Sequence, residues 1–291
     1  MAQQLVLMIV QAAMYSAFAA GLTLIFGVLD IVNLAHGALY MWGAFIAWVV
    51  LVKLGLGIVP ALLLSLALTG LLAVLIDLSA FKPLRERGAP GLMALISSLA
   101  IGALLVQASQ AIFGAEILRF PSQVIPKQPI VIGPVAISPV QILTVVLGGV
   151  SVLGLWLLVN RTGLGLAIRA IEENQAVAEL MGIPVDRTIT ITFFIAGAMA
   201  AASGISVGLS FVAISPFMGS TMELKAFAII ILGGMGSIPG AIVGAVAIAA
   251  IESLTVITGL SMFKEVSVFA LVIVLLLTRP RGIFGRERRS V

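Results

Sequence analysis

The sequence predicts an all-α, polytopic transmembrane helix bundle, and composition carries that prediction. Hydrophobic residues make up 61% of the 291 residues, charged residues only 10%, and the mean hydropathy is +1.25. A soluble domain carries about 25% charged residues, and at this length so thin a polar shell cannot cover so large an apolar core. We therefore expect an integral membrane protein, folded as a single transmembrane domain over residues 1–291.

Apolar segments of about 20 residues, the length that crosses a bilayer as a helix, recur along the chain. The run 222–258 is too long for one span and is interrupted by GGMGSIPG, so we expect it to form two. The remaining expected spans are 5–28, 37–53, 58–80, 90–113, 139–159, 188–212 and 266–278. The total is eight or nine spans, with broken or re-entrant helices among them.

The first apolar run is expected to stay in the mature protein. No Lys or Arg precedes Lys53, so the cationic start of a cleaved signal peptide is missing. Small residues within the spans, as in GAMAAASGISVG at 197–208, favour close packing of helices.

Basic residues indicate the orientation, because cytoplasmic loops retain Lys and Arg. They gather in the loop FKPLRERGAP at 81–90, the loop 161–187 and the tail 279–291. We expect these three regions, including the C-terminus, to face the cytoplasm. The net charge of +4 then reflects topology, and no nucleic acid is expected as a partner.

The loop 114–138 is expected on the outer side. It contains four prolines, which disfavour a helix and favour extended or turn structure; they are Pro121, Pro126, Pro129 and Pro134. The loop either meets an outside partner or merely connects two spans.

Enzyme motifs are absent from the sequence. It has no GxxxxGK[ST] phosphate loop, no HExxH, one histidine and no cysteine. A His-dependent triad, a multi-His metal site and a Cys nucleophile are thereby excluded. We expect no metal and no cofactor, and if the function consumes ATP, another chain must bind it.

The cytoplasmic loop carries an amphipathic pattern between Arg169 and Met181, which predicts a short helix stopped by Gly182 and Pro184. Its apolar positions include Ile168, Ile171 and Leu180, and its polar ones Glu172, Glu173 and Glu179. The pattern fits either a helix that docks a soluble partner or an interfacial helix on the lipid headgroups.

Polar side chains interrupt the apolar pattern in GVLDIVNLAHG, between Gly27 and Gly37. Asp30, Asn33 and His36 recur every three residues, so in a helix they share one side. An Asp at the bilayer centre costs about 2.5–3.5 kcal/mol and usually faces a cavity or a partner. The segment is either such a site or an ordinary cytoplasmic turn.

The later interruption LGGMGSIPGAIVGA is similar in design to the first, because an apolar span meets a glycine-rich break and resumes with Gly-Ala. Broken helices in two halves of a transporter point to a substrate site near the midplane.

Three segments together resemble the LivH-type permease subunits of ATP-binding-cassette importers for branched-chain amino acids. They are GLTLIFGVLDIVNLAHGALYMWGAF at 21–45, IRAIEENQAVAELMGIPVDRTITITFFIAGAMAAASG at 168–204 and LKAFAIIILGGMGSIPGAIVGA at 224–245. The resemblance implies a bacterial inner-membrane importer. Its partners would be a second homologous permease, as a heterodimer, two cytoplasmic ATPases and an outside solute-binding protein.

The resemblance also implies roles for individual residues. The helix at about 172–181 would couple to the ATPase, with Ala178 and Gly182 matching the family motif. The residues expected to line or shape the solute path are Asn33, His36, Gly37, Gly233, Gly234, Gly236 and Ser237. Those expected to form the structural break are Gly27, Asp30 and Pro239, and those expected to couple to the ATPase are Arg169, Glu172, Glu173, Ala178, Glu179 and Gly182.

Two other functions stay open. Very similar permeases import urea, short amides or other amino acids. A secondary carrier independent of ATP would need intramembrane carboxylates, for which Asp30, Glu223 and Glu252 are the candidates, with Asp77 near an inner end.

Overall fold

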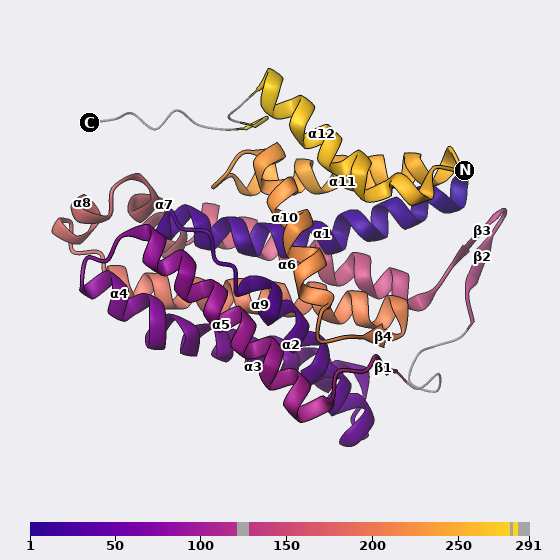
Figure 1. Ribbon diagram of the computed structural model, residues 1–291, viewed down its shortest axis with the longest axis horizontal. Helices are drawn as coiled ribbons and strands as arrows, with labels where there is room; N and C mark the ends of the chain where they lie inside the picture. The colour runs from indigo at the N-terminus through magenta and orange to yellow at the C-terminus, as the bar shows by residue number, and fades with distance from the viewer. Residues whose placement is uncertain (121–127, 280–281, 285–291) are drawn as a thin grey trace.

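The structure, a computed structural model, describes residues 1–120, 128–279 and 282–284, and it is a bundle of long helices (Figure 1). The helices are α1 (Ala2–Leu29), α2 (His36–Trp48), α3 (Ile58–Ile76), α4 (Lys82–Glu86), α5 (Gly91–Phe113), α6 (Pro139–Arg161), α7 (Gly163–Glu173), α8 (Gln175–Leu180), α9 (Val185–Phe211), α10 (Met218–Gly233), α11 (Ile238–Ile257) and α12 (Lys264–Thr278). One π-helical segment, Val49–Lys53, continues α2, and another, Asp77–Phe81, joins α3 to α4. A 3₁₀ turn, Ser261–Phe263, leads into α12.

Short antiparallel strands are confined to the loops. β1 (Leu118–Arg119) pairs with β4 (Ala213–Ile214), and β2 (Ile130–Ile132) forms a hairpin with β3 (Val135–Ile137). The predicted absence of helix between 114 and 138 is confirmed for the described part. Pro121 and Pro126 lie outside the described residues.

The bundle has two distinct ends (Figure 1). The N-terminus and the β2–β3 hairpin lie at one of them, which we call the hairpin end. The other, with α4, α7 and α8, we call the basic end. Two of the three basic regions, 81–90 and 161–187, therefore share one end, as the orientation argument requires. The third lies largely outside the described residues, which include Arg279 but not Arg281, Arg286, Arg288 or Arg289.

The predicted fold class is confirmed. Eight helical segments within the described ranges are long and apolar enough to cross a membrane. The predicted division of the run 222–258 is also confirmed, because α10 and α11 form a helical pair. α10 has only 16 residues and is not among the eight.

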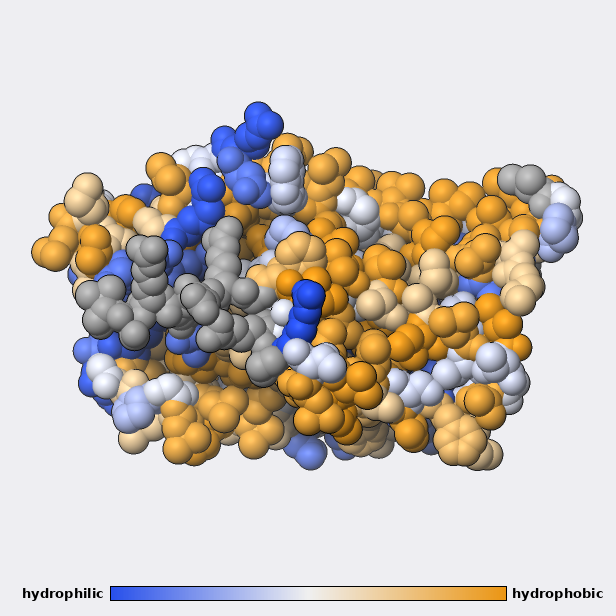
Figure 2. Space-filling model, turned by 90° about the horizontal axis from the view of Figure 1, so that it is seen from above, coloured by the Kyte–Doolittle hydropathy of each residue, from blue (hydrophilic) through white to orange (hydrophobic). Residues whose placement is uncertain are grey.

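Three helices form the centre of the bundle. The apolar windows of α1, α2 and α9 are 61%, 67% and 72% buried, against 22% for α5 and 11% for α12. Small residues permit this packing, since a side chain at Gly204 of α9 would strike the backbone of Tyr40 in α2. The outer helices expose many large apolar side chains, and hydrophobic residues cover most of the face in Figure 2. This is the surface that lipid and neighbouring subunits can cover.

Candidate functional site

The segment GVLDIVNLAHG forms a break inside the bundle. α1 ends at Leu29, and Asp30 adopts a left-handed conformation with φ 55°. The chain then runs without helix until α2 begins at His36, whose Nε2 lies 3.3 Å from the carbonyl oxygen of Phe18 near the middle of α1. α2 therefore starts deep among the other helices.

Asp30, Asn33 and His36 do not lie along one side of a helix, because the condition for that alignment, a helical segment, is not met. Residues 31–35 are not helical, so a spacing of three residues does not place side chains on the same side there. Asp30 is exposed, whereas Asn33 and His36 are completely buried. Asp30 thus ends α1, and only Asn33 and His36 reach the interior.

Hydrogen bonds from side chains and backbone hold the break. Asn33 Oδ1 accepts from the backbone N–H of Ala35 at 3.0 Å, and the N–H of Leu34 donates to Ser98 Oγ of α5 at 3.1 Å. Within the described part of the chain, Asn33 Nδ2 and His36 Nδ1 are buried and make no hydrogen bond. Buried polar atoms without a partner are costly and are usually explained by water, an ion or a ligand.

A second helix begins at the same place. Gly37, in the first turn of α2, packs against Gly219, in the first turn of α10, so closely that a side chain on Gly219 would strike the backbone of Gly37. The carboxylate of Glu223 lies against Gly37, 2.9 Å from the position of a side-chain carbon there. Its Oε1 is buried with no hydrogen-bond partner in the described residues. We call Asn33, His36, Gly37, Gly219 and Glu223 the helix junction.

The helix junction brings two helix N-termini together, and these carry partial positive charge. Broken helices that meet in this way provide anion-binding N–H groups and irregular backbone inside a membrane protein. Of its members, Gly219 was missed by sequence reasoning, and Glu223 was considered only as a carrier carboxylate. The sequence does carry one signal of this second break. Pro216 lies just before α10, and proline lacks the backbone N–H that a continuous helix needs.

The glycine-rich segment GGMGSIPG lies elsewhere. It forms the turn between α10 and α11, where Gly234 and Gly236 have φ 102° and 81°. Ser237 Oγ accepts from the N–H of Gly240 at 3.1 Å and caps α11, whose first turn contains Pro239. The backbones of Gly233 and Gly240 touch.

The two interruptions noted in the sequence therefore do not face each other as a pair. Their contact is marginal, since a side-chain carbon at Gly236 would lie 3.9 Å from Gly27 Cα. The interruption that meets the first break is instead 212–217, between α9 and α10. Glycine content alone did not distinguish these two.

The basic loop contains two helices where one was predicted over 172–181. Asn174 divides α7 from α8, and its Oδ1 accepts from the N–H of Val177 at 3.0 Å as the N-cap of α8. Asn is a preferred N-cap residue because its side chain satisfies a free backbone donor at a helix start. Because α7 and α8 are separate helices, the second half of the amphipathic pattern does not continue the face formed by the first half.

The faces of the loop differ from the expectation accordingly. Ile168, Ile171 and Ala178 are buried against the bundle, whereas Leu180 is 86% exposed, so the predicted apolar positions do not share one face. Met181 is 78% exposed. The expected coupling residues that remain exposed are Arg169, Glu173, Glu179 and Gly182, while Glu172 is half-buried beside Gly27.

An ionic link ties this loop to α3. Arg85 contacts Asp77 at 2.7 Å and Asp186 at 3.2 Å, and Thr190 Oγ1 donates to Asp77 at 2.7 Å. Asp77 is completely buried at the end of α3. Asp186 lies in the first turn of α9, near the end of the loop. This link therefore joins the start of α9 to the end of α3.

Comparison with known proteins agrees with this architecture. Residues 4–278 match the family described as branched-chain amino acid transport system / permease component. The chain is 33% identical to the high-affinity branched-chain amino acid transport system permease protein BraD of Pseudomonas aeruginosa, over 98% of this chain and 95% of that protein. It is 31% identical to the LivH permease protein of Escherichia coli K12, over 94% and 91%.

An archaeal relative is similar to the same degree. The probable branched-chain amino acid transport permease protein LivH of Methanocaldococcus jannaschii is 32% identical, over 94% of this chain and 89% of that protein. No solved structure matches the chain. The family match spans almost every described helix, and the chain belongs to the family of branched-chain amino acid transport permease components.

Proposed function

We propose that this permease forms one transmembrane half of an ATP-driven importer that carries branched-chain and other hydrophobic amino acids across the bacterial inner membrane. The observation that carries the proposal is the helix junction, where buried polar atoms without partners lie between two helix N-termini inside an apolar bundle. The names of the relatives support the solute class. The shared architecture supports the membrane location.

In this proposal the helix junction shapes the solute path. The N-termini of α2 and α10 favour a carboxylate, and Asn33 and His36 offer hydrogen-bonding atoms to solute or to the water that accompanies it. Asp30 pins the end of α1. Gly233, Gly234, Gly236 and Ser237 act at a distance, by holding α10 against α11 through their turn.

The partner ATPase docks at the basic end. The adjacent exposed apolar side chains of Leu180 and Met181 support this, because a contiguous exposed apolar patch marks an interaction site. The loop 161–187 and the tail 279–291 then face the cytoplasm. Two ATPases, a second homologous permease as heterodimer partner, and a solute-binding protein at the hairpin end complete the importer.

Reconstitution tests the function directly. The permease, purified with the chains that associate with it, is placed in proteoliposomes, and uptake of radioactive leucine is measured. We expect uptake to require ATP on the ATPase side and the solute-binding protein on the other. Uptake of urea or acetamide in place of leucine would correct the solute, and leucine uptake driven by an ion gradient without any ATPase would overturn the proposal.

Docking has its own test. Leu180→Glu places a charge on the exposed apolar surface of α8, so we expect the ATPase to be lost from the purified complex while the permease stays in the membrane. Leu166→Glu is the matched control, since Leu166 of α7 is also exposed, at 63%. Equal loss of ATPase in both variants would contradict a specific role for α8.

A further inference from the structure

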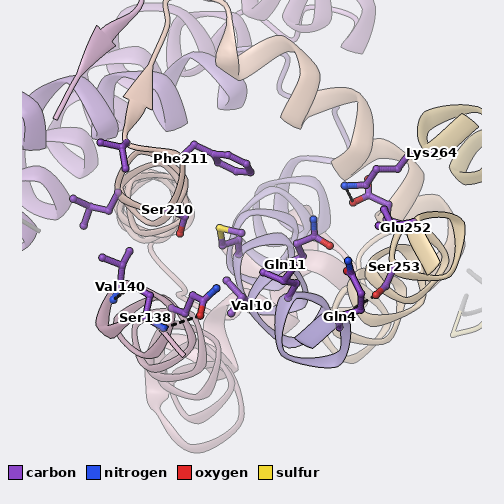
Figure 3. Close-up of a pocket in the computed structure, with 16 residues that line it drawn as sticks. Gln4, Val10, Gln11, Ser138, Val140, Ser210, Phe211, Glu252, Ser253 and Lys264 are labelled. Carbon is purple, nitrogen blue, oxygen red and sulfur yellow. Dashed lines mark hydrogen bonds and ion pairs between the residues drawn. The ribbon is translucent and has the colours of Figure 1, made fainter. Parts of the chain in front are cut away.

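A cavity of about 350 Å³ opens toward the hairpin end, away from the helix junction. Its wall combines the first half of α1, the start of α6, the end of α9, the end of α11 and the start of α12 (Figure 3). Ligand pockets in proteins begin at about 300 Å³, so the cavity has room for one small molecule.

One corner of the cavity is charged. Glu252 of α11 is completely buried, and its carboxylate accepts from Tyr15 Oη at 2.8 Å, from Lys225 Nζ at 2.6 Å and from Lys264 Nζ at 2.9 Å. Three donors thus hold this carboxylate within the wall. Glu265 lines a separate, smaller pocket with Lys225.

Lys264 is the cation of this corner that lines the cavity. An ammonium group has three donor hydrogens, and in the described residues Lys264 forms an ion pair with Glu252 alone. Its other hydrogens are available to an anion in the cavity. The corner therefore offers an ammonium group that can bind a carboxylate.

An amide lies opposite the charged corner. Gln11 belongs to the apolar span α1, lines the cavity, and makes no side-chain hydrogen bond among the described residues. Figure 3 places its amide between Phe211 and the Glu252–Lys264 pair. An amide within a span is costly unless it is hydrogen-bonded. Its carbonyl oxygen can accept from an ammonium group of a ligand, and its NH₂ can donate to a carboxylate.

The rest of the wall is largely apolar. Side chains of Val10, Met14, Leu209 and Phe211 face the same space. A ligand that matches all three parts has a carboxylate for the ammonium corner, a polar hydrogen for the amide and a compact hydrocarbon side chain. A zwitterionic α-amino acid with a branched apolar side chain has this combination at this size.

We propose that this cavity is a binding site for a hydrophobic α-amino acid at the hairpin end of the permease, with Lys264 holding the carboxylate and Gln11 the ammonium group. The proposal rests on the proposed function and adds to it a first station on the solute's route. Gln11 is then a residue that determines specificity for the zwitterion, at a distance from the helix junction.

Protection from chemical labelling tests the site without relying on transport. The chain contains no cysteine, so Val256→Cys, on the cavity wall, provides a single reactive thiol in this subunit of the assembled complex. We expect leucine to slow its reaction with a maleimide. Leucinamide, which lacks the carboxylate, and isocaproate, which lacks the ammonium group, should not.

Substitution of the amide sharpens the test. In the Val256→Cys background, Gln11→Leu should raise the leucine concentration for half-maximal protection about tenfold, as expected for the loss of roughly one hydrogen bond. Gln107→Leu, an exposed position on α5, should leave it unchanged. The comparison of leucine with its two analogues keeps the test decisive even if Gln11→Leu fails to assemble.

The outcomes separate this inference from the proposed function. If the complex imports leucine with ATP but leucine never slows labelling, or slows it no more than its analogues do, the cavity is not the site and the proposed function stands. If labelling responds to lipid or detergent but not to leucine, the cavity holds an acyl chain and the inference is wrong. A complex that imports no amino acid overturns both.

Discussion

The two chain interruptions at 30–35 and 234–237 look alike in sequence and differ in where they lie and in how their polar groups are paired. The first lies inside the bundle and, within the described residues, leaves buried polar atoms without hydrogen-bond partners. The second is a turn at the basic end in which a serine caps the next helix and glycines adopt positive φ. A break with unsatisfied polar groups is a place for function, whereas a capped break is a place for connection.

The largest expected effect tests the close contact at the helix junction. Gly219→Leu forces a side chain into the backbone of Gly37, and overpacking of this kind costs about 1–3 kcal/mol. We expect leucine uptake to fall as much as about 100-fold, measured in proteoliposomes at equal protein. Gly149→Leu is the control, because nothing lies within 4 Å of a side-chain carbon there. Equal uptake by the two variants would show that the junction need not be tight.

A smaller effect is expected from the polar group at the first break. Asn33→Leu removes the acceptor of the Ala35 N–H and leaves a buried donor unsatisfied, at about 1–3 kcal/mol. We expect uptake to fall about tenfold while the complex still assembles, as checked by co-purification of the ATPase. If Asn33→Ala and His36→Ala leave both uptake and assembly unchanged, neither residue shapes the solute path.

The smallest effect is expected at the second break. Ser237→Ala removes the N-cap of α11, which costs about 1 kcal/mol of stability. A slightly lower melting temperature with uptake close to that of the unaltered protein is the expected result, measured by thermal unfolding in detergent and by transport. A loss of uptake as large as that of Asn33→Leu would remove the distinction between the two breaks.

The parts of the fold that could be predicted are those that depend on many residues at once. Hydropathy summed over a span identified the membrane class and the helical pair within 222–258, and the prolines of 114–138 indicated extended structure. Both signals are local and additive. The resemblance carried by 21–45, 168–204 and 224–245 agrees with the family match.

The pairing of breaks could not be predicted, because a glycine shows that backbones approach closely without showing which backbones. The sequence around Gly37 does not indicate that Gly219 packs against it. The division at Asn174 was within reach, because an Asn in an amphipathic pattern is a ready helix N-cap. The exposure of Leu180 that follows from this division could not be predicted, because it depends on the tertiary position of α8.

The meeting of α2 and α10 at their first turns has a mechanical consequence. α2 leads from that contact toward the hairpin end, and α10 leads from it to the turn before α11 (Figure 1). The two helices meet at Gly37 and Gly219, which have no side chains that could interlock them. We expect α2 and α10 to be able to change their relative angle at this contact without either helix bending.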